Sequence, residues 1–432
     1  MEYVYPDRGT EETSNRQVNT GTLVKGPAAL PPYLSGANWS QFRGNSRNGI
    51  ADSGTSLLKS WPAQGLKVIW RIPVGEGHAG AAVNGGRVYL VDYDRDKEED
   101  AIRCLSLADG TEVWRYTYYV SIKRNHGMSR TVPAVNDDYV VALGPMGQVT
   151  CLRAETGELV WKMDLVKEYK SVIPPWYAGQ CPLIDDGAAI IAPGGDPLMM
   201  AVDLASGQIR WRTPNPGDWG MTHSSIMAFD YEGVHQYVYC TTRGVVGVDA
   251  ADGKILWTHP GWKISIANIP SPVFVPPDRL FFSGGYDSGC QMVRLTGPAD
   301  RMQVAEVFRL RPDVFGADQQ TPILYQDHLF GVIPNGQLAC LDLQGKQVWT
   351  SGAATRFGIG PYMIAQGMIL ALADQDGTLH LAEASTQGYR ELARAKVLNG
   401  HDAWAPMALA DGRLLLRDLT EMVCVEVGAQ KQ

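Results

Sequence analysis

The sequence predicts an all-β protein, an eight-bladed β-propeller of four-stranded antiparallel blades whose ring is closed by an N-terminal strand joining the last blade. Three observations predict this fold. A short motif recurs along the chain, successive copies lie 41 to 51 residues apart, and an unpaired strand remains at each end of the array. A period of this length is typical of four-stranded propeller blades.

The motif is clearest in CLRAETGELVW, residues 151–161. Related stretches are CLSLADGTEVW (104–114), AVDLASGQIRW (201–211), GVDAADGKILW (247–257) and the shorter CLDLQGKQVW (340–349). In each copy a glycine precedes a tryptophan by four residues: Gly110 and Trp114, Gly157 and Trp161, Gly207 and Trp211, Gly253 and Trp257, Gly345 and Trp349. Glycine adopts the left-handed conformation that a short antiparallel turn requires, and we expect the tryptophan to end the second strand and cover a neighbouring blade.

Weaker copies complete the array. The aromatic or apolar residues that mark the outer strand of each unit are Trp70, Trp114, Trp161, Trp211, Trp257, Phe308, Trp349 and about Leu392. Two further turn signals precede each motif, as in AAVNGGRVYLV (81–91), so each unit contains four strands. The last unit has only three strands, and KVIWRI (67–72) supplies the missing one. Pairing KVIWRI with CVEV (424–427) closes the ring and removes exposed sheet edges.

The chain therefore divides into four parts. Residues 1–38 are polar and aperiodic, which predicts an extended or partly disordered arm. Residues 39–66 contain enough aromatic and leucine residues to pack on the propeller, residues 67–427 form the eight blades, and residues 428–432 are a tail. The charged run from Asp94 to Asp100 is interpreted as a solvated hairpin tip and not as a metal site.

Composition narrows the range of functions. The chain has 432 residues, a net charge of −8 and no Lys/Arg block, so we expect no nucleic-acid partner. No apolar window approaches the length of a transmembrane span. The first residues lack the basic start and apolar run of a secretory signal, so a cytoplasmic location stays open.

Several catalytic chemistries have no support in the sequence. The seven cysteines form no CxxC pair and are best interpreted as buried thiols. The eight histidines show no metal-ligand spacing, so no metal site is expected. There is no GxSxG nucleophile motif, and the glycines of GGRVY and PGGDP belong to turns because no helix follows them.

The repeat, best matched by LRAETGELVW, VDLASGQIRW and VDAADGKILW, resembles that of the pyrroloquinoline-quinone-type propeller family. WSQFRGNSRNGIA and KVLNGHDAWAPMALADGRL are similar to stretches of bacterial propellers described only as quinone-binding-like. The family includes quinoprotein alcohol dehydrogenases, which hold the quinone and calcium in the central funnel. It also includes cofactor-free members such as the scaffold lipoprotein of the outer-membrane barrel assembly machinery, which this chain resembles more closely.

Residues at the starts of the inner strands would line the central channel, whether it holds only water or a ligand. By alignment of the repeats they include His78, Gln180, His223, Ser224, Gln319, Gln320 and Gly360. A quinone would need a stacking surface and a cation for its carboxylates, for which Trp404 and Arg130 are the candidates. Calcium would need oxygen ligands, for which Asn268 and Asp402 are the candidates. The adjacent cysteine pair of the alcohol dehydrogenases is absent from the sequence.

The function we expect is therefore non-catalytic, with no catalytic residues and no cofactor. The protein would be a protein-binding scaffold or accessory subunit of the bacterial cell envelope, a periplasmic location being implied by the resemblance. Loop aromatics at Trp176, Tyr177, Trp219 and Trp262 would either anchor the partner or pack over the blades. The alternative is an oxidoreductase of the alcohol or sugar dehydrogenase type that uses pyrroloquinoline quinone and calcium in the funnel.

Overall fold

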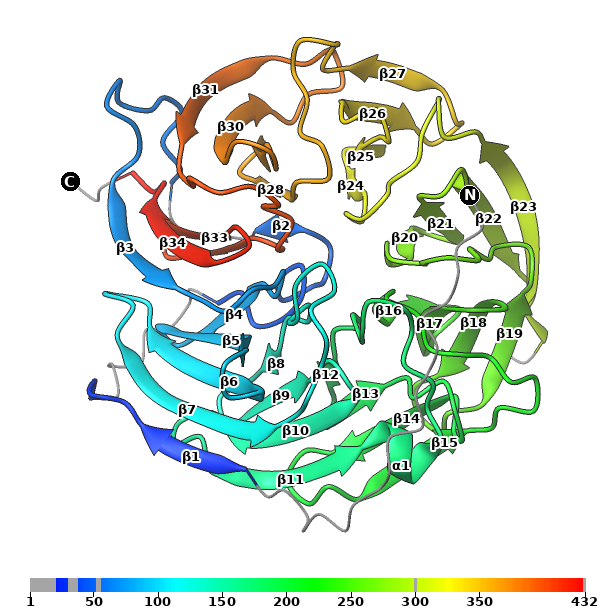
Figure 1. The fold of residues 1–432 in the computed structure, drawn as a ribbon. Coiled ribbons are helices and arrows are strands. Elements are labelled where there is room, and N and C mark those ends of the chain that lie inside the picture. The colour runs from blue at the N-terminus through cyan, green and yellow to red at the C-terminus, as the bar shows by residue number, and fades with distance from the viewer. Residues whose placement is uncertain (1–20, 30–37, 52–55, 299–300, 430–432) are drawn as a thin grey trace.

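Eight β-sheets surround a central axis like the blades of a propeller (Figure 1). The computed structural model describes residues 21–29, 38–51, 56–298 and 301–429. Every blade has four antiparallel strands that follow one another outward from the axis, and two blades carry a fifth strand. The predicted fold class is confirmed. The one α-helix of the described residues, α1 (Leu165–Tyr169), follows the outer strand of blade two.

The first four blades follow the chain without interruption. Their strands are β4 (Ala81–Asn84), β5 (Arg87–Asp94), β6 (Glu99–Ser106) and β7 (Glu112–Tyr119) in blade one; β8 (Ala134–Val135), β9 (Tyr139–Leu143), β10 (Gln148–Arg153) and β11 (Leu159–Asp164) in blade two; β12 (Leu183–Asp185), β13 (Ala188–Ile191), β14 (Met199–Asp203) and β15 (Ile209–Thr213) in blade three; and β16 (Met227–Tyr231), β17 (Val234–Thr241), β18 (Gly244–Asp249) and β19 (Ile255–His259) in blade four.

The next three blades repeat the pattern, and the last blade is shared between the two ends of the chain. Their strands are β20 (Val273–Val275), β21 (Arg279–Gly284), β22 (Gly289–Thr296) and β23 (Gln303–Leu310) in blade five; β24 (Ile323–Tyr325), β25 (His328–Val332), β26 (Leu338–Asp342) and β27 (Gln347–Thr350) in blade six; β28 (Tyr362–Ala365), β29 (Met368–Leu372), β30 (Thr378–Glu383) and β31 (Glu391–Lys396) in blade seven; and β32 (Ala408–Ala410), β33 (Arg413–Arg417), β34 (Glu421–Glu426) and β3 (Val68–Pro73) in blade eight.

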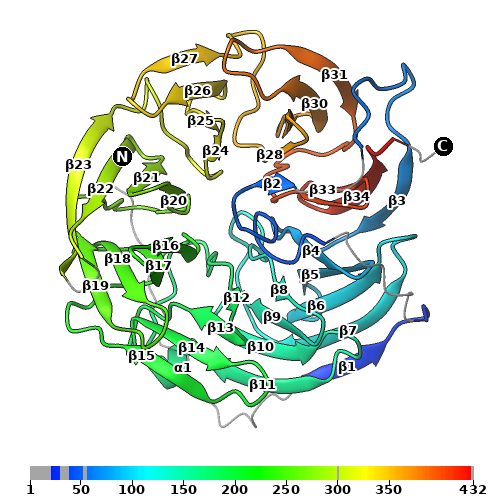
Figure 2. The same cartoon turned by 180° about the vertical axis from the view of Figure 1, so that it is seen from behind.

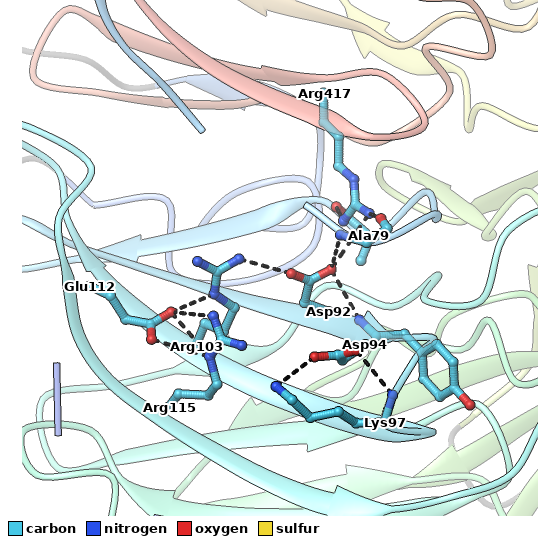
Figure 3. Close-up of polar contacts among 10 residues, drawn as sticks. Ala79, Asp92, Asp94, Lys97, Arg103, Glu112, Arg115 and Arg417 are labelled. Atoms are coloured by element: carbon cyan, nitrogen blue, oxygen red, sulfur yellow. Dashed lines mark hydrogen bonds and ion pairs between the residues drawn. The ribbon is translucent and has the colours of Figure 1, made fainter. Parts of the chain in front are cut away.

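The ring closes as the sequence predicts. Strand β3 pairs antiparallel with β34 and becomes the outer strand of blade eight. A buried chain of charges then joins blade eight to blade one: Arg417 donates to the Ala79 carbonyl and lies 4.0 Å from Asp92, which pairs with Arg103 (Figure 3). Glu112 continues the chain outward to Arg115. Because each charge faces an opposite one, the network tolerates burial at the seam where the chain ends meet.

Tryptophans on the outer strands join five of the blades to the next one. The indole N–H of Trp114 donates to the carbonyl of Ala154 at 3.2 Å, and that of Trp161 to Leu204 at 2.9 Å. Trp70, Trp211 and Trp349 make the equivalent bond to the turn of the following blade. A buried indole N–H needs an acceptor, and the next blade's turn supplies one at a fixed place.

The glycine of each motif has two structural roles. Gly207 has a φ of +71°, as the turn requires, and a Cβ added there would lie 2.8 Å from the Trp161 ring of the preceding blade. The same contact joins Gly110 to Trp70, Gly157 to Trp114, Gly253 to Trp211 and Gly345 to Phe308. The sequence predicted the turn conformation but not this contact, because the contact joins different repeats.

The tryptophans do not end their strands, and that prediction is wrong. Strand β7 continues five residues beyond Trp114, to Tyr119. In all eight blades a register shift, typical of a β-bulge, falls between the two outer strands just before this position. The position opposite the ring is small: Cys104, Cys151, Cys340 and Cys424 pair with a tryptophan there. In blade seven the residue at this register is Ala393, one place after the Leu392 expected.

The charged run at the hairpin of blade one is only partly solvated. Residues 95–97 are exposed, but Asp100 is 1% exposed and accepts a short hydrogen bond from the Tyr118 hydroxyl. Burial raises the pKa of Asp100 to about 7, although the Tyr118 bond opposes this shift. The interpretation of the run as a solvated tip is therefore wrong for Asp100. A long hairpin returns to the blade edge, so its last residue lies against blade two and not in solvent.

Part of the N-terminal arm adds a strand to blade one. Residues 1–20 and 30–37 of the arm, and 430–432 of the tail, lie outside the described residues. Strand β1 (Thr22–Lys25) pairs antiparallel with the outer edge of β7, from Thr22 opposite Thr117 to Lys25 opposite Trp114. Figure 1 shows β1 on the outer rim of the ring. The sequence gives no strand pattern here, because the pairing uses backbone groups on a rim edge.

Candidate functional site at the central channel

One side of the central channel is covered by the segment that follows the arm. Trp39 forms an isolated bridge with Val83 of blade one, and the Val135 N–H of blade two donates to the Ser40 carbonyl. Strand β2 (Ile50–Ala51) pairs with β28 of blade seven. Residues 39–51, here called the plug, therefore bridge blades on both sides of the axis (Figure 2).

Two buried arginines of the plug bind carbonyls at the starts of inner strands. Arg43 donates to the Pro322 carbonyl of blade six at 2.9 Å, and Arg47 to the carbonyls of Cys181 and Pro182 of blade three. Burial lowers the pKa of both guanidinium groups to about 10, so both stay protonated at neutral pH. Their hydrogen bonds satisfy carbonyl oxygens that would otherwise face the channel.

The inner strands are tied to one another by a chain of hydrogen bonds across five blades. One residue just before each inner strand donates its backbone N–H to the side chain of the equivalent residue in the next blade. The bonds run from Val132 to Cys181 Sγ, from Cys181 to Ser225, from Ser225 to Ser271, and from Ser271 to Thr321, at 2.9 to 3.2 Å. These polar groups thus hold the ring together and are not available to a ligand.

The opposite mouth of the channel is lined by aromatic and basic side chains. His78 stacks on Trp404 with ring centroids 4.5 Å apart, and its Nε2 lies 2.9 Å from the His126 carbonyl. Arg130 donates to the same carbonyl at 3.1 Å and to Asn125 at 2.8 Å. Burial and the charge of Arg130 lower the pKa of His78 to about 3, so the imidazole is neutral. The structure therefore brings His78, Trp404 and Arg130 together.

The polar groups of Trp404 also form hydrogen bonds with other residues of the protein. Its indole N–H donates to Asp374 at 3.1 Å, and its carbonyl accepts from Gln320 at 2.9 Å. Gln320 donates as well to the Ile359 carbonyl. The cavity next to Gln319 and Gln320 has a volume of about 10 Å³, which is room for about one water molecule.

His223 and Ser224 lie on the blade-four side of the channel. His223 is 8% exposed, and its Nε2 lies 2.7 Å from the Pro175 carbonyl. Burial, with a smaller effect of Arg130, lowers the pKa of His223 to about 4. The Ser224 hydroxyl donates to the Pro270 carbonyl. Both side chains are buried and have partners in neighbouring loops.

Gln180 has no surface open to a ligand. Its side chain is fully buried, exchanges hydrogen bonds with the backbone of Ala192, and donates to the Tyr239 hydroxyl of blade four. Gly360 has its α-carbon against the Leu372 carbonyl, where a Cβ would lie 1.9 Å from the oxygen. Gln180 thus connects blades three and four, whereas Gly360 packs within blade seven.

Asn268 and Asp402, the two residues considered for calcium, make no hydrogen bond or ion pair with each other among the described residues. Asn268 is 1% exposed, and neither atom of its amide has a hydrogen-bond partner among the described residues. Asp402 adopts a left-handed φ of +58°, and its carboxylate lies 3.1 Å from His401. Within the described ranges, no three His, Cys, Asp or Glu side chains are placed to hold a metal ion.

These residues do not fit the quinone and its calcium. One face of Trp404 is covered by His78, and the N–H of its indole is held by Asp374. Arg130 directs one nitrogen of its guanidinium to two backbone carbonyls. A planar cofactor would have to displace His78, and among the described residues its metal would find no group of three His, Cys, Asp or Glu side chains to hold it.

Sequence reasoning missed the plug arginines and the hydrogen-bonded ring of inner strands. The stretch FRGNSRNG (42–49) carried a signal for the plug arginines. Its two arginines lie among glycines and close to aromatic residues, with no acidic residue within the stretch to pair with them. The hydrogen-bonded chain of inner strands had a weaker sequence signal. A small polar residue precedes the inner strand in blades three to six: Cys181, Ser225, Ser271 and Thr321. Of the loop aromatics, Trp262 packs beneath Arg309 and is 1% exposed, so it is not an anchor for a partner.

The fold and its repeats define a propeller of the quinone-type repeat class, and most candidate residues near its axis are bonded to other parts of the protein. The sequence model described as outer membrane protein assembly factor BamB matches residues 98–344. The chain belongs to this family, which confirms the resemblance seen in the repeats. No curated protein sequence matches the chain.

Two solved structures with TM-scores above 0.5 support the same fold. BamB from Moraxella catarrhalis is 13% identical, with a TM-score of 0.56 over 84% of this chain and 99% of that one. The computationally designed Ika8 protein is 11% identical, with a TM-score of 0.54 over 83% of this chain and 99% of the other. A europium-containing methanol dehydrogenase is 13% identical and covers 90% of this chain and 89% of its own, with a TM-score of 0.49. No described helix has the length and apolar character needed to cross a membrane.

Proposed function

We propose that this protein is a non-catalytic scaffold or accessory subunit that binds another protein in the bacterial cell envelope. Membership of the BamB family supports this assignment, because that family is described by its part in outer membrane protein assembly. A periplasmic or envelope location and a protein partner follow from the same likeness.

The observation that carries the proposal is the state of the channel. In the dehydrogenases that the repeat resembles, the axis is where a cofactor is held. Here Arg43 and Arg47 bond to carbonyls at the starts of inner strands, and His78 covers one face of Trp404, the ring on which a quinone would stack. A disk whose residues near the axis are bonded to one another offers its rim and faces for recognition.

Two measurements test the proposal on the full chain. The first is titration with pyrroloquinoline quinone and calcium, followed by absorbance and dye-linked alcohol and sugar oxidation. We expect no stoichiometric uptake and no turnover at high micromolar quinone. Tight uptake with turnover would overturn the scaffold assignment in favour of the oxidoreductase.

The second measurement is the size of the native assembly after cross-linking in intact cells and fractionation of the envelope. We expect the protein in the envelope fraction, in a complex larger than its own 47.2 kDa. A monomer in the cytoplasmic fraction would contradict both the partner and the location.

A further inference from the structure

We propose that the mouth of the channel beside Trp404 binds a carboxylate group of the partner protein, and that Arg130 is the residue that pairs with it. The inference rests on the proposed scaffold function and gives it a surface and a partner chemistry. The carboxylate comes from the C-terminus of the partner or from an acidic side chain, because both groups present the same oxygens to a guanidinium. Peptides that carry one group or the other separate the two sources.

Arg130 is a positive charge that has no acidic partner among the described residues. Its Nη2 donates to the carbonyls of Asn125 and His126, and its buried Nε has no hydrogen-bond partner. Burial lowers the pKa of the guanidinium to about 10, so the group keeps its charge at neutral pH. Two neutral carbonyls do not balance that charge, and a partly buried charge without a counter-ion is unfavourable. An anion would therefore be stabilised at this position.

One nitrogen of this guanidinium is available to a ligand. Nη1 forms no hydrogen bond among the described residues and, unlike Nε, it is not buried. A carboxylate can therefore reach Nη1 from solvent while Nη2 keeps Arg130 in place. This requirement differs from that of a planar quinone, because a carboxylate leaves His78 stacked on Trp404.

The loop that carries Arg130 is basic. Residues 121–130, SIKRNHGMSR, contain Lys123 and Arg124 and no acidic residue, in a chain whose net charge is −8. Arg124 pairs with Glu76, whereas Lys123 is exposed. The loop therefore adds a positive potential to the charge of Arg130, which attracts an acidic group of a partner.

The acidic side chains next to Trp404 have other partners. Asp374 accepts from the indole N–H of Trp404 and from the backbone N–H of Ile359, both at 3.1 Å. The Asp402 carboxylate lies 3.1 Å from His401. Neither carboxylate forms an ion pair with Arg130 among the described residues, so neither takes the place of the ligand.

Aromatic side chains beside the basic loop give the partner an apolar contact. The Tyr177 hydroxyl donates to the Lys123 carbonyl, which joins the segment between blades two and three to the basic loop. Trp176 lies with its ring centroid 6.3 Å from that of His223. Trp176, Tyr177 and Trp404 are all partly exposed. We therefore expect an aromatic or apolar residue at or next to the residue that carries the carboxylate.

The test uses two pairs of labelled peptides and fluorescence anisotropy with the full-length protein. One pair ends in phenylalanine, with either a free C-terminal carboxylate or an amide. The other pair is amidated and carries either glutamate or glutamine next to an internal phenylalanine. We expect the charged member of at least one pair to bind at least tenfold more tightly than its neutral counterpart, and that pair identifies the source of the carboxylate. Equal affinities within both pairs would overturn the proposal.

Three variants assign the preference to Arg130. Arg130→Gln should remove the difference within the pair, and Arg130→Lys should keep part of it, because lysine keeps the charge but not the planar guanidinium. Lys123→Gln is the matched control, since it removes one positive charge from the same loop, and it should change the preference less than threefold. If Lys123→Gln removes the preference as completely as Arg130→Gln, the peptides bind to the loop as a whole and the site is wrong.

Competition on the parent protein tests the site without any variant. Sodium acetate should displace the charged peptide at concentrations at which acetamide and sodium chloride do not. Equal displacement by acetate and chloride would contradict a site for carboxylates. Binding of N-acetylphenylalanine as tight as that of the peptides would show a site for a small acid and would overturn the protein partner.

The native complex separates this inference from the scaffold function. A complex that is lost with Arg130→Gln but persists with Lys123→Gln supports the site. A complex that persists with both shows a scaffold that uses another surface, so only the carboxylate proposal falls. Peptide binding that depends on Arg130 in a protein that forms no native complex would support the site and contradict the scaffold function.

Discussion

The seam between blades one and two and the seam between blades four and five use the same residue in different ways. Trp114 extends to the next blade and donates to the Ala154 carbonyl, whereas Trp257 stays within blade four and donates to the Gln236 side chain at 3.0 Å. Its ring lies over Gly247, where a Cβ would be 2.0 Å from it. The equivalent residues in other blades, such as Cys104, have a side chain there.

Blade five explains the rest of the difference. Its two outer strands are joined through a longer loop around residues 297–302 instead of the tight glycine turn that receives a tryptophan elsewhere. A bond between blades therefore needs two things: an acceptor carbonyl at the turn of the next blade, and a side chain beneath the ring that keeps it pointing outward. Trp257 has neither, although the motif GVDAADGKILW looks complete.

The largest expected effect is that of removing a ring from the first seam. Trp114 is fully buried, and Trp114→Ala should lower the free energy of unfolding by about 3–5 kcal/mol because a cavity replaces the ring. Trp257→Ala should cost about 1 kcal/mol less, because the hydrogen bond that it loses, to Gln236, lies within blade four and the seam to blade five keeps its own bonds. Urea unfolding measures both. Equal losses would contradict the distinction between the two seams.

The first seam should also respond to pH. Because the pKa of Asp100 is raised to about 7, the folded protein keeps a proton that the unfolded chain has released above about pH 4. The free energy of unfolding should therefore fall as the pH rises from about 4 to 7. Asp100→Asn should remove this fall, on the order of 2–4 kcal/mol by pH 8.

The pH dependence is measured by urea unfolding of the parent protein and the Asp100→Asn variant at a series of pH values. His78 and His223 have lowered pKa values, so they destabilise the fold in the opposite direction, as the pH falls below about 6.5. Both proteins share that effect, and the difference between their profiles isolates Asp100. Parallel profiles would show that the carboxyl is ionised throughout.

A smaller effect is expected from the glycine that faces a tryptophan. Gly207→Ala forces a left-handed alanine and displaces the Trp161 ring, so it should cost about 2–3 kcal/mol. Gly233→Ala is the matched control, because Gly233 has a φ of +75° with nothing within 4 Å of its added Cβ. It should cost only about 1–2 kcal/mol. If thermal unfolding gives the same loss for both, the ring contact contributes nothing.

The smallest effect isolates the hydrogen bond. Trp211→Phe keeps a ring over Gly253 but loses the N–H that donates to Ala250, and should cost about 1 kcal/mol. Phe308 already occupies this position in blade five, with its ring on Gly345. A loss as large as that of Trp114→Ala would show that the bond and the packing cannot be separated.

Much of the rim could be predicted from the sequence. The interval between Gly157 and Trp161 defines a hairpin, and its recurrence gives the number and order of the blades. The closure by β3 followed from counting strands. These features depend on local turn conformation and on a repeated apolar pattern, both of which are written in consecutive residues.

The centre could be predicted only in part. The position of a residue in the repeat predicted which residues lie near the axis. It did not predict that Gln180 forms a hydrogen bond with the next blade, or that His78 stacks on Trp404. Asp100 was misplaced for a related reason, since its environment comes from Tyr118 and from blade two. A side chain's partners across blades depend on the angle and distance between sheets, which no single repeat contains.

The sequence by itself determined the blades, their order and the closure of the ring, because each depends on local periodicity and on satisfying strand edges. The tertiary structure alone decided which surfaces remain open. It bonded Arg43 and Arg47 of the plug to the starts of inner strands in blades six and three, and it covered the edge of β7 with β1. The reason is physical: a segment outside the repeat makes its contacts with several blades at once, and the relative positions of those blades are not contained in any single repeat.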